Sequence, residues 1–295
     1  MMNQPVEVFH RPVLTDEVLE YLQPGTGTVI DACVGGGGHA RAILKILGRG
    51  RLLGIDVDPE AIASARRRLD KQNNVVLVQA NYIDMVSIVR KFGFSPVTGV
   101  LMDLGVSLHQ LRSSCRGFAY DREGPIDMRF DQTASQPPAL VLLRRASAKS
   151  IKKWLKDFGQ EPFAGRIARR IYEHRGQVET TKDLVDLVRR CVPARRARKT
   201  LARVFQALRI VTNHELENVR AGLDAALGLL VPEGRLVVIS YHSLEDRLAK
   251  VALRDAKKQG RVRILTPKPV CPSLEEVERN PQARSARLRA GEVLS

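Results

Sequence analysis

The segment Asp31-Ala32-Cys33-Val34-Gly35-Gly36-Gly37-Gly38-His39 joins an apolar, strand-like stretch to a stretch in which apolar residues recur with helical spacing. Further strand-like stretches follow at residues 51–56, 75–79 and 99–103, and helix-like stretches separate them. Short apolar strands that alternate with helices predict a parallel sheet covered by helices on both faces. We therefore expect an α/β fold of the doubly wound type, with a mostly parallel sheet.

The alternation stops after Asp103. Residues 107–209 form a polar stretch followed by several short basic segments, in which apolar residues recur every three or four positions. That spacing predicts short amphipathic helices. We expect a discontinuous sheet domain of residues 1–106 and 210–295, interrupted by a small helical domain at residues 107–209 that recognises the substrate.

The C-terminal part resumes the α/β pattern. A helix is expected at residues 217–230, a turn at Pro232-Glu233-Gly234 and a strand at residues 235–240. A helix at residues 244–258 and a short strand at residues 262–265 follow, and the remaining residues are expected to form a tail.

The charge of the chain is concentrated in the insert. Lys and Arg number 48 against 32 Asp and Glu, and residues 107–209 alone hold 23 basic and 10 acidic side chains. Such an excess favours an anionic polymer as the partner. Eight arginines of the insert are candidates for phosphate contacts, although charged runs are often solvated helix faces: Arg166, Arg169, Arg170, Arg189, Arg190, Arg195, Arg196 and Arg198.

No stretch approaches the ~18 consecutive apolar residues of a membrane-spanning helix, and residues 1–13 lack the apolar core of a secretory signal. We therefore expect a cytoplasmic protein. Cys33, Cys115, Cys191 and Cys271 lie far apart and have no Cys or His partner at zinc-ligand spacing. This spacing predicts reduced cysteines and no metal site.

The glycine run Gly35 to Gly38 lets the backbone approach a ligand, because glycine has no Cβ. The following helix offers free amide donors to an anionic group, such as the carboxylate of S-adenosylmethionine. Asp56 ends the second strand 21 residues after Gly35, where it can accept hydrogen bonds from both hydroxyls of a ribose. Gly35-x-Gly37-x-x-Ala40 also fits the relaxed dinucleotide fingerprint, so NAD is an alternative cofactor.

Two further residues are candidates for catalysis. Asp103 ends the fourth strand, at the edge where catalytic groups gather in doubly wound sheets, although an isolated aspartate in such a loop is more often a cap. His242 follows the fifth strand and is expected at the same edge, as a substrate contact, a proton acceptor or a cap of the next helix. No Gly-x-Ser-x-Gly elbow accompanies these residues, which argues against a hydrolase.

A series of short segments runs in one order along nearly the whole chain. The segments are His10-Arg11-Pro12-Val13-Leu14, Gly35 to His39, Gly54-Ile55-Asp56-Val57-Asp58-Pro59-Glu60-Ala61, Asp103-Leu104-Gly105-Val106-Ser107, Arg116-Gly117-Phe118, Gly124-Pro125-Ile126-Asp127-Met128-Arg129, Phe205-Gln206-Ala207-Leu208-Arg209-Ile210, Glu215-Leu216-Glu217, Ser240-Tyr241-His242-Ser243-Leu244-Glu245-Asp246-Arg247 and Asn280-Pro281-Gln282-Ala283-Arg284-Ser285-Ala286. In this order they closely resemble the small-subunit rRNA (cytosine-N4)-methyltransferase family, RsmH or MraW.

The resemblance implies a Rossmann-like sheet that binds S-adenosylmethionine and an inserted helical domain that helps to hold RNA. The implied reaction is methyl transfer to the N4 amine of a cytidine in the decoding region of small-subunit rRNA, within an assembling ribosomal subunit. The family's cofactor contacts fall on seven positions of this sequence: Gly37, Gly38, His39, Asp56, Tyr82, Asp103 and Gln110.

Three segments depart from the family pattern, and one of them is Gly159-Gln160-Glu161 in place of the usual Gly-Glu-Glu. The usual Ser-Ser-Pro-Gln-Leu is Ser107-Leu108-His109-Gln110-Leu111 here, and Arg198-Lys199-Thr200-Leu201-Ala202-Arg203 replaces a His-Pro-Ala-Thr-Arg segment. These changes bear on RNA contact and site choice. Two alternatives stay open: a methyltransferase acting on DNA, protein or a small molecule, and a non-catalytic rRNA-binding assembly factor. Asp103-Leu104-Gly105-Val106 lacks the Ser/Asp-Pro-Pro-Tyr motif of many DNA cytosine-N4 enzymes, which weakens the DNA option.

Overall fold

The computed structural model describes residues 12–295 and contains two compact units. The first, here called the sheet unit, comprises Met1–Gly105 and Leu216–Ser295, and the second, the helical unit, comprises Val106–Glu215. His10 and Arg11, part of the first resemblance segment, lie outside the described residues. Among residues 12–295, no helix is both long and apolar enough to cross a membrane.

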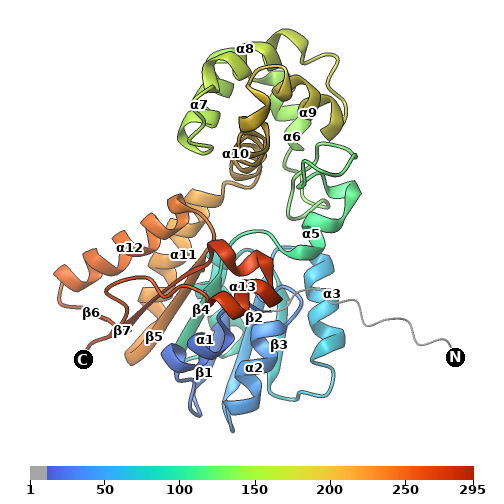
Figure 1. The fold of residues 1–295 in the computed structure, drawn as a ribbon. Helices are drawn as coiled ribbons and strands as arrows, with labels where there is room; N and C mark the ends of the chain where they lie inside the picture. The colour runs from blue at the N-terminus through green and yellow to red at the C-terminus, as the bar shows by residue number, and fades with distance from the viewer. Residues whose placement is uncertain (1–11) are drawn as a thin grey trace, which may run out of the picture. The chain divides into compact units, whose positions relative to one another are not determined.

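The sheet unit is built on seven strands in the order β3-β2-β1-β4-β5-β7-β6 (Figure 1). All pairings from β3 to β5 are parallel, whereas β7 runs antiparallel to both β5 and β6. The predicted doubly wound, mostly parallel sheet is confirmed. The strands are β1 (Thr28–Asp31), β2 (Arg51–Asp56), β3 (Val75–Gln79), β4 (Val97–Asp103), β5 (Leu230–Ser240), β6 (Val262–Ile264) and β7 (Arg287–Val293).

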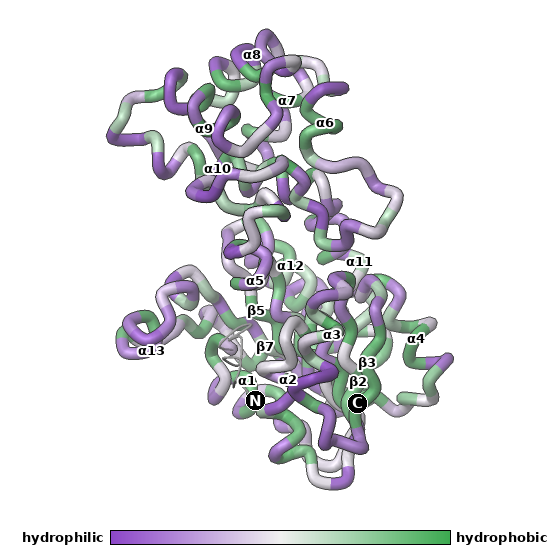
Figure 2. The backbone as a smooth tube through the Cα atoms, turned by 90° about the vertical axis from the view of Figure 1, so that its right-hand side faces the viewer, coloured by the Kyte–Doolittle hydropathy of each residue, from purple (hydrophilic) through white to green (hydrophobic). Residues whose placement is uncertain are grey.

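Helices cover both faces of this sheet because the central strands are apolar on both sides. Side chains of a strand point alternately to opposite faces, and Leu101 packs into one core while its neighbours Val100 and Met102 pack into the other. Figure 2 shows these hydrophobic strands between α4 and α1. One face carries α1 (Thr15–Leu22), α2 (Gly38–Ile46) and α3 (Pro59–Arg68), and the other carries α4 (Met85–Phe92), α11 (Glu215–Leu229) and α12 (Ser243–Lys258).

The C-terminal segment is not a tail, as the sequence predicted, but the strand β7, which lies between β5 and β6. The apolar pattern of this segment does not indicate a strand, because a charged residue occupies a buried position. Arg289 is 7% exposed, and its guanidinium donates to both carboxylate oxygens of Asp246 on α12, at 2.7 and 3.2 Å. A buried guanidinium needs hydrogen-bond acceptors, and the Asp246 carboxylate also balances its charge.

The predicted turn at Pro232-Glu233-Gly234 is part of β5. Leu230 pairs with Val97 and Arg235 pairs with Gly99, so the residues between Leu230 and Arg235 form a bulge in the strand. Glu233 has a φ of 65°, a left-handed conformation that fits such an irregularity. The chain thus passes from α11 into β5 without a separate loop.

The helical unit has a core of its own. Its main helices are α6 (Ala139–Arg145), α7 (Ala148–Asp157), α8 (Ala164–His174), α9 (Thr181–Arg189) and α10 (Ala194–Asn213), preceded by the short α5 (Leu108–Arg112). Apolar residues such as Ile151, Ile167, Leu184 and Val204 are fully buried among them. The loop before α6 is fixed by the buried Arg116, which donates to the carbonyls of Arg129 and Phe130 at 3.1 and 2.7 Å.

Breaking the buried pair between β7 and α12 tests the role of this strand. Arg289→Ala is expected to lower the free energy of unfolding by about 2–3 kcal/mol, because the buried Asp246 would keep only the half-exposed Arg287 as a partner. Arg254→Ala, which removes an exposed arginine of α12, serves as the control and is expected to change it by about 0.5 kcal/mol or less. Urea unfolding followed by circular dichroism measures both, and equal effects would contradict the role assigned to the pair.

Candidate active site

Three aspartates end three neighbouring strands of the sheet unit. Asp31 ends β1, Asp56 ends β2 and Asp103 ends β4, and β1 lies between the other two. Because the strands are parallel, the three carboxyl groups lie at one edge of the sheet. The carboxyl ends of strands form the ligand site in doubly wound folds.

Asp31 is the most deeply buried of the three, with 1% of its surface exposed. Neither carboxylate oxygen has a hydrogen bond of ordinary geometry within the described residues, although the backbone N–H of Cys33 lies close enough to lower the pKa of Asp31. Burial raises its pKa from 3.8 to about 7; nearby His39 lowers it, and Asp103 and Asp56 raise it. Asp31 is a site residue that the sequence did not predict, although an acid at the end of a strand, shortly before a glycine loop, was a usable signal.

Asp56 organises the glycine loop through its side chain. One carboxylate oxygen accepts the backbone N–H of Gly35 at 2.8 Å, and the other accepts that of Asp58 at 2.9 Å. Burial raises the pKa of Asp56 to about 6, against the lowering effect of these backbone hydrogen bonds. Asp58 in turn caps α3 by accepting the N–H of Glu60 at 2.9 Å. The loop and the second strand therefore hold each other in place.

Three glycines of the loop are required by backbone conformation or packing. Gly35 and Gly37 have φ values of 50° and 77°, in the left-handed region that glycine adopts at little cost. A Cβ on Gly38 would lie 3.1 Å from Pro12, so a side chain there would be tight. Backbone conformation and packing therefore require these glycines, in addition to the ligand approach that the sequence predicts.

His39 and Tyr241 both face the carboxylate of Asp103. The Tyr241 hydroxyl donates to Oδ1 at 2.9 Å, and His39 Nε2 lies 3.4 Å from Oδ2. Burial lowers the pKa of His39, but the nearby carboxylates of Asp103 and Asp31 outweigh it, so the net pKa lies above the usual value. Burial next to Asp103 raises the pKa of Tyr241 well above its ordinary range, so Tyr241 stays a donor. Asp103 is thus a fixed acceptor.

Tyr82 lies in the turn that follows β3. A Cβ on Gly222 of α11 would come within 2.6 Å of the Tyr82 ring, so the ring lies directly against the backbone at this glycine. Gly222 therefore determines where the aromatic ring sits. The predicted stacking of Tyr82 on an adenine stays a prediction.

His242 is the N-cap of α12. Its Nδ1 accepts the N–H of Glu245 at 3.4 Å, its Nε2 lies 3.2 Å from Glu245 Oε1, and Oε2 of that carboxylate accepts the Tyr241 N–H at 2.9 Å. Of the roles that the sequence left open, the geometry shows the cap. A role of His242 in proton transfer stays a prediction.

Gln110 belongs to the helical unit. It is 5% exposed and completes the capping box of α5: its Oε1 accepts the Ser107 N–H at 2.9 Å, and its own N–H donates to Ser107 Oγ at 3.2 Å. The segment in which this chain departs from the family pattern therefore forms a regular helix start. A contact of Gln110 with the cofactor stays a prediction.

The fold and this edge define a class: a doubly wound α/β protein with a nucleotide-type cofactor site, formed by a glycine loop, an acid after the second strand and further buried acids. The sequence matches the MraW methylase family over residues 7–294. The chain belongs to the MraW methylase family.

The relatives are similar to this chain over nearly their whole length. The Ribosomal RNA small subunit methyltransferase H of Thermotoga neapolitana is 46% identical, with 97% of this chain and 96% of the relative covered. The protein of the same name from Thermomicrobium roseum is 44% identical, with 100% of this chain and 96% of the relative covered. The similarity therefore includes both the sheet unit and the helical unit.

The raised pKa of Asp31 predicts a stability change with pH. The folded protein holds a proton on Asp31 that the unfolded chain releases at lower pH, so this contribution to stability is present below about pH 4 and is lost as the pH rises through about 7. Asp31→Asn has no carboxyl group at this position, so the variant does not lose this stability as the pH rises. The thermal midpoint of Asp31→Asn relative to wild type, measured without ligand, is expected to rise between about pH 4 and about pH 8.

Asp16→Asn, at an exposed side chain of α1, is the control for this titration. Its midpoint relative to wild type is expected to stay constant over the same range. A constant difference for Asp31→Asn as well would show that the Asp31 carboxyl is not the group that titrates.

Proposed function

We propose that this chain transfers a methyl group from S-adenosylmethionine to the N4 amine of a cytidine in the decoding region of small-subunit rRNA. Membership of the MraW methylase family supports a methyltransferase over an NAD-dependent enzyme. The names of the relatives support small-subunit rRNA as the substrate. The observation that carries the proposal is the row of three carboxyl groups at the edge of the sheet, which suits a cationic methyl donor.

The residues at this edge fit S-adenosylmethionine. Asp31, buried and without a hydrogen bond of ordinary geometry in the described residues, would accept from the ammonium group of the methionine part. The free amides at the start of α2, next to Gly37 and Gly38, would bind its carboxylate. Asp56 would accept from the ribose hydroxyls with the lone pairs that Gly35 and Asp58 leave over, and Tyr82 would stack on the adenine.

When bound, S-adenosylmethionine supplies a methyl group on a positively charged sulfur, which an in-line nucleophile attacks. A cytosine amine is a weak nucleophile because its lone pair is delocalised into the ring. We assign Asp103 to accept a hydrogen bond from this amine and to take up its proton. The Tyr241 hydroxyl and the His39 imidazole hold the Asp103 carboxylate in one orientation, so we assign both as positioning residues.

The helical unit would hold the RNA, because the basic excess of the chain lies within residues 107–209. We propose that the enzyme acts in the cytoplasm on an assembling small subunit. Access to a paired cytidine would require the base to unstack.

A labelled-methyl assay tests the proposed function. The protein is incubated with radiolabelled S-adenosylmethionine and with immature small subunits, free rRNA, DNA or protein. We expect label in the rRNA, and nucleoside mass spectrometry should identify it as N4-methylcytidine. Absence of label from every RNA would overturn the proposal, and label on another atom of the base would overturn the assignment of the amine.

Substitutions around Asp103 separate the acceptor from the residues that position it. Asp103→Asn should lower kcat by about 10²–10⁴-fold, because an amide cannot take up the proton. Tyr241→Phe should lower kcat about tenfold while the KM for RNA stays within about twofold, because the Asp103 carboxylate loses the donor that orients it. Tyr172→Phe, at an exposed tyrosine of α8, is the control. A kcat of Tyr241→Phe equal to that of the control, or a loss confined to KM, would refute the positioning role.

A further inference from the structure

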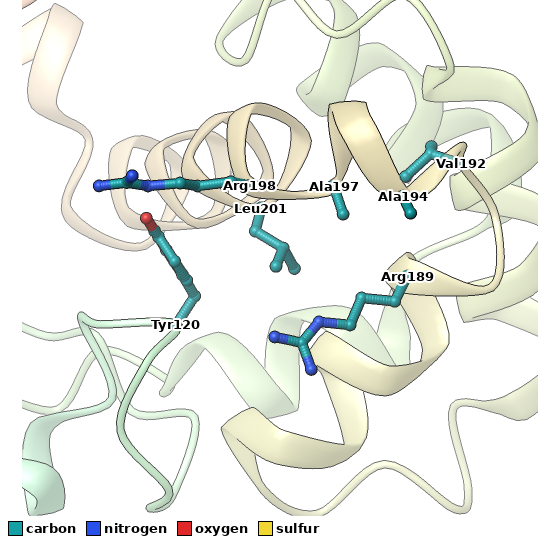
Figure 3. Close-up of a pocket in the computed structure, with 7 residues that line it drawn as sticks. All are labelled: Tyr120, Arg189, Val192, Ala194, Ala197, Arg198 and Leu201. Carbon is teal, nitrogen blue, oxygen red and sulfur yellow. The ribbon is translucent and has the colours of Figure 1, made fainter.

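The helical unit contains a hollow of about 550 Å³ between α9, α10 and the loop before α6 (Figure 3). Its apolar lining comes from Val192, Ala194, Ala197 and Leu201. Ala197 and Leu201 lie one turn apart on α10, and Figure 3 shows both side chains pointing into the hollow. A space of this volume is in the range of small-molecule sites.

Polar groups stand at the rim of this hollow. Tyr120 lines it from the loop, Arg189 from the end of α9 and Arg198 from α10. Both arginines are exposed. The ring of Tyr120 packs edge-on against the buried Phe205, with ring centroids 6.0 Å apart and an angle of 76° between the rings, so the aromatic wall is anchored in the core.

These features match the chemistry of a single-stranded nucleotide. A base requires an apolar or aromatic surface, and its phosphate requires cations at the border of that surface. The hollow offers both, because two guanidinium groups from different helices border one apolar floor. The strongly basic insert that surrounds it favours RNA over an apolar or cationic ligand.

We propose that this hollow binds an unstacked nucleotide of the RNA substrate, with the base on the apolar lining beside Tyr120 and the adjoining phosphates on Arg189 and Arg198. The inference rests on the proposed function. All of the lining residues belong to the helical unit, and none of the carboxylates assigned to methyl transfer lines the hollow. We therefore assign to it a nucleotide other than the cytidine that reacts.

One segment that departs from the family pattern, residues 198–203, contributes to this hollow. Residues 198–203 replace the family's His-Pro-Ala-Thr-Arg segment, and both Arg198 and Leu201 line the hollow. The substituted segment thus supplies one of the two cations and part of the floor. We expect this pocket to contribute to the choice of the flanking RNA sequence in this chain.

Filling the hollow tests the proposal without a change of charge. Ala197→Phe should weaken binding of a fluorescent single-stranded RNA of about eight nucleotides by about tenfold or more, because base stacking contributes ~1–3 kcal/mol. Binding is measured by fluorescence anisotropy on the full chain. Ala202→Phe, an exposed position on the same helix, is the matched control and should stay within about twofold of wild type.

A second pair of variants keeps the test independent of the stability of Ala197→Phe. Arg198→Gln should weaken the same RNA more than Lys199→Gln, which removes one charge from the neighbouring exposed position. Duplex RNA should show no difference between the two, because its bases stay stacked. Equal losses within both pairs of variants would overturn the proposal and leave the hollow to another occupant, such as a protein segment.

The binding assay requires no methyl transfer, so the two proposals fail separately. If wild type methylates rRNA while Ala197→Phe and Arg198→Gln bind and methylate like their controls, the pocket assignment fails and the proposed function stands. If no RNA is methylated but the pocket variants still lose RNA, the proposed function fails and the hollow remains an RNA site.

Discussion

The edge of the sheet is governed by the burial of its carboxyl groups, to which their mutual repulsion adds. Asp31 is enclosed by the protein and lies close enough to Asp56 and Asp103 for each to raise its pKa. Such an arrangement costs folding free energy unless a proton or a cation compensates it. In the ligand-free protein the His39 side chain compensates part of this cost, and below about pH 7 a proton on Asp31 compensates the rest, since the pKa of Asp31 is about 7. A cationic cofactor would do the same and would gain binding energy from it.

The rest of the sheet unit keeps these three groups in place. The order β2-β1-β4 sets Asp31 between the other two acids, and the parallel register brings the ends of the strands to one edge. Backbone amides fix Asp56, while a tyrosine and a histidine fix Asp103. Even the C-terminal strand contributes, because β7 pairs with β5, the strand that leads into Tyr241. Stability and site geometry therefore depend on the same contacts.

Much of this architecture was predictable from local patterns. The strand-loop-helix start, the inserted basic helices, and the places of Asp56 and Asp103 at strand ends all follow from the spacing of apolar residues and glycines. The same spacing did not reveal β7, because a buried arginine breaks its apolar pattern and its partner Asp246 lies 43 residues away. Nor could the sequence decide between a cap and a proton acceptor for His242, since the contact with Glu245 depends on the rotamer of each side chain.

The contacts around the three aspartates could not be predicted from the sequence either. A strand-end aspartate was visible, but the pairing of Asp103 with Tyr241 joins residues that are 138 positions apart. Whether the Asp31 carboxylate receives a hydrogen bond depends on how every neighbouring segment folds around it. Such features arise only once the chain has folded, and they are the ones that give the site its chemistry.

Proton release on cofactor binding tests the central claim most directly. S-adenosylmethionine is titrated calorimetrically into wild type and Asp31→Asn at about pH 6.5, in two buffers of different ionisation enthalpy, because a cation that binds beside partly protonated acids must expel protons. The account predicts net release from wild type and a smaller release from Asp31→Asn. Binding of the same enthalpy in both buffers would contradict it.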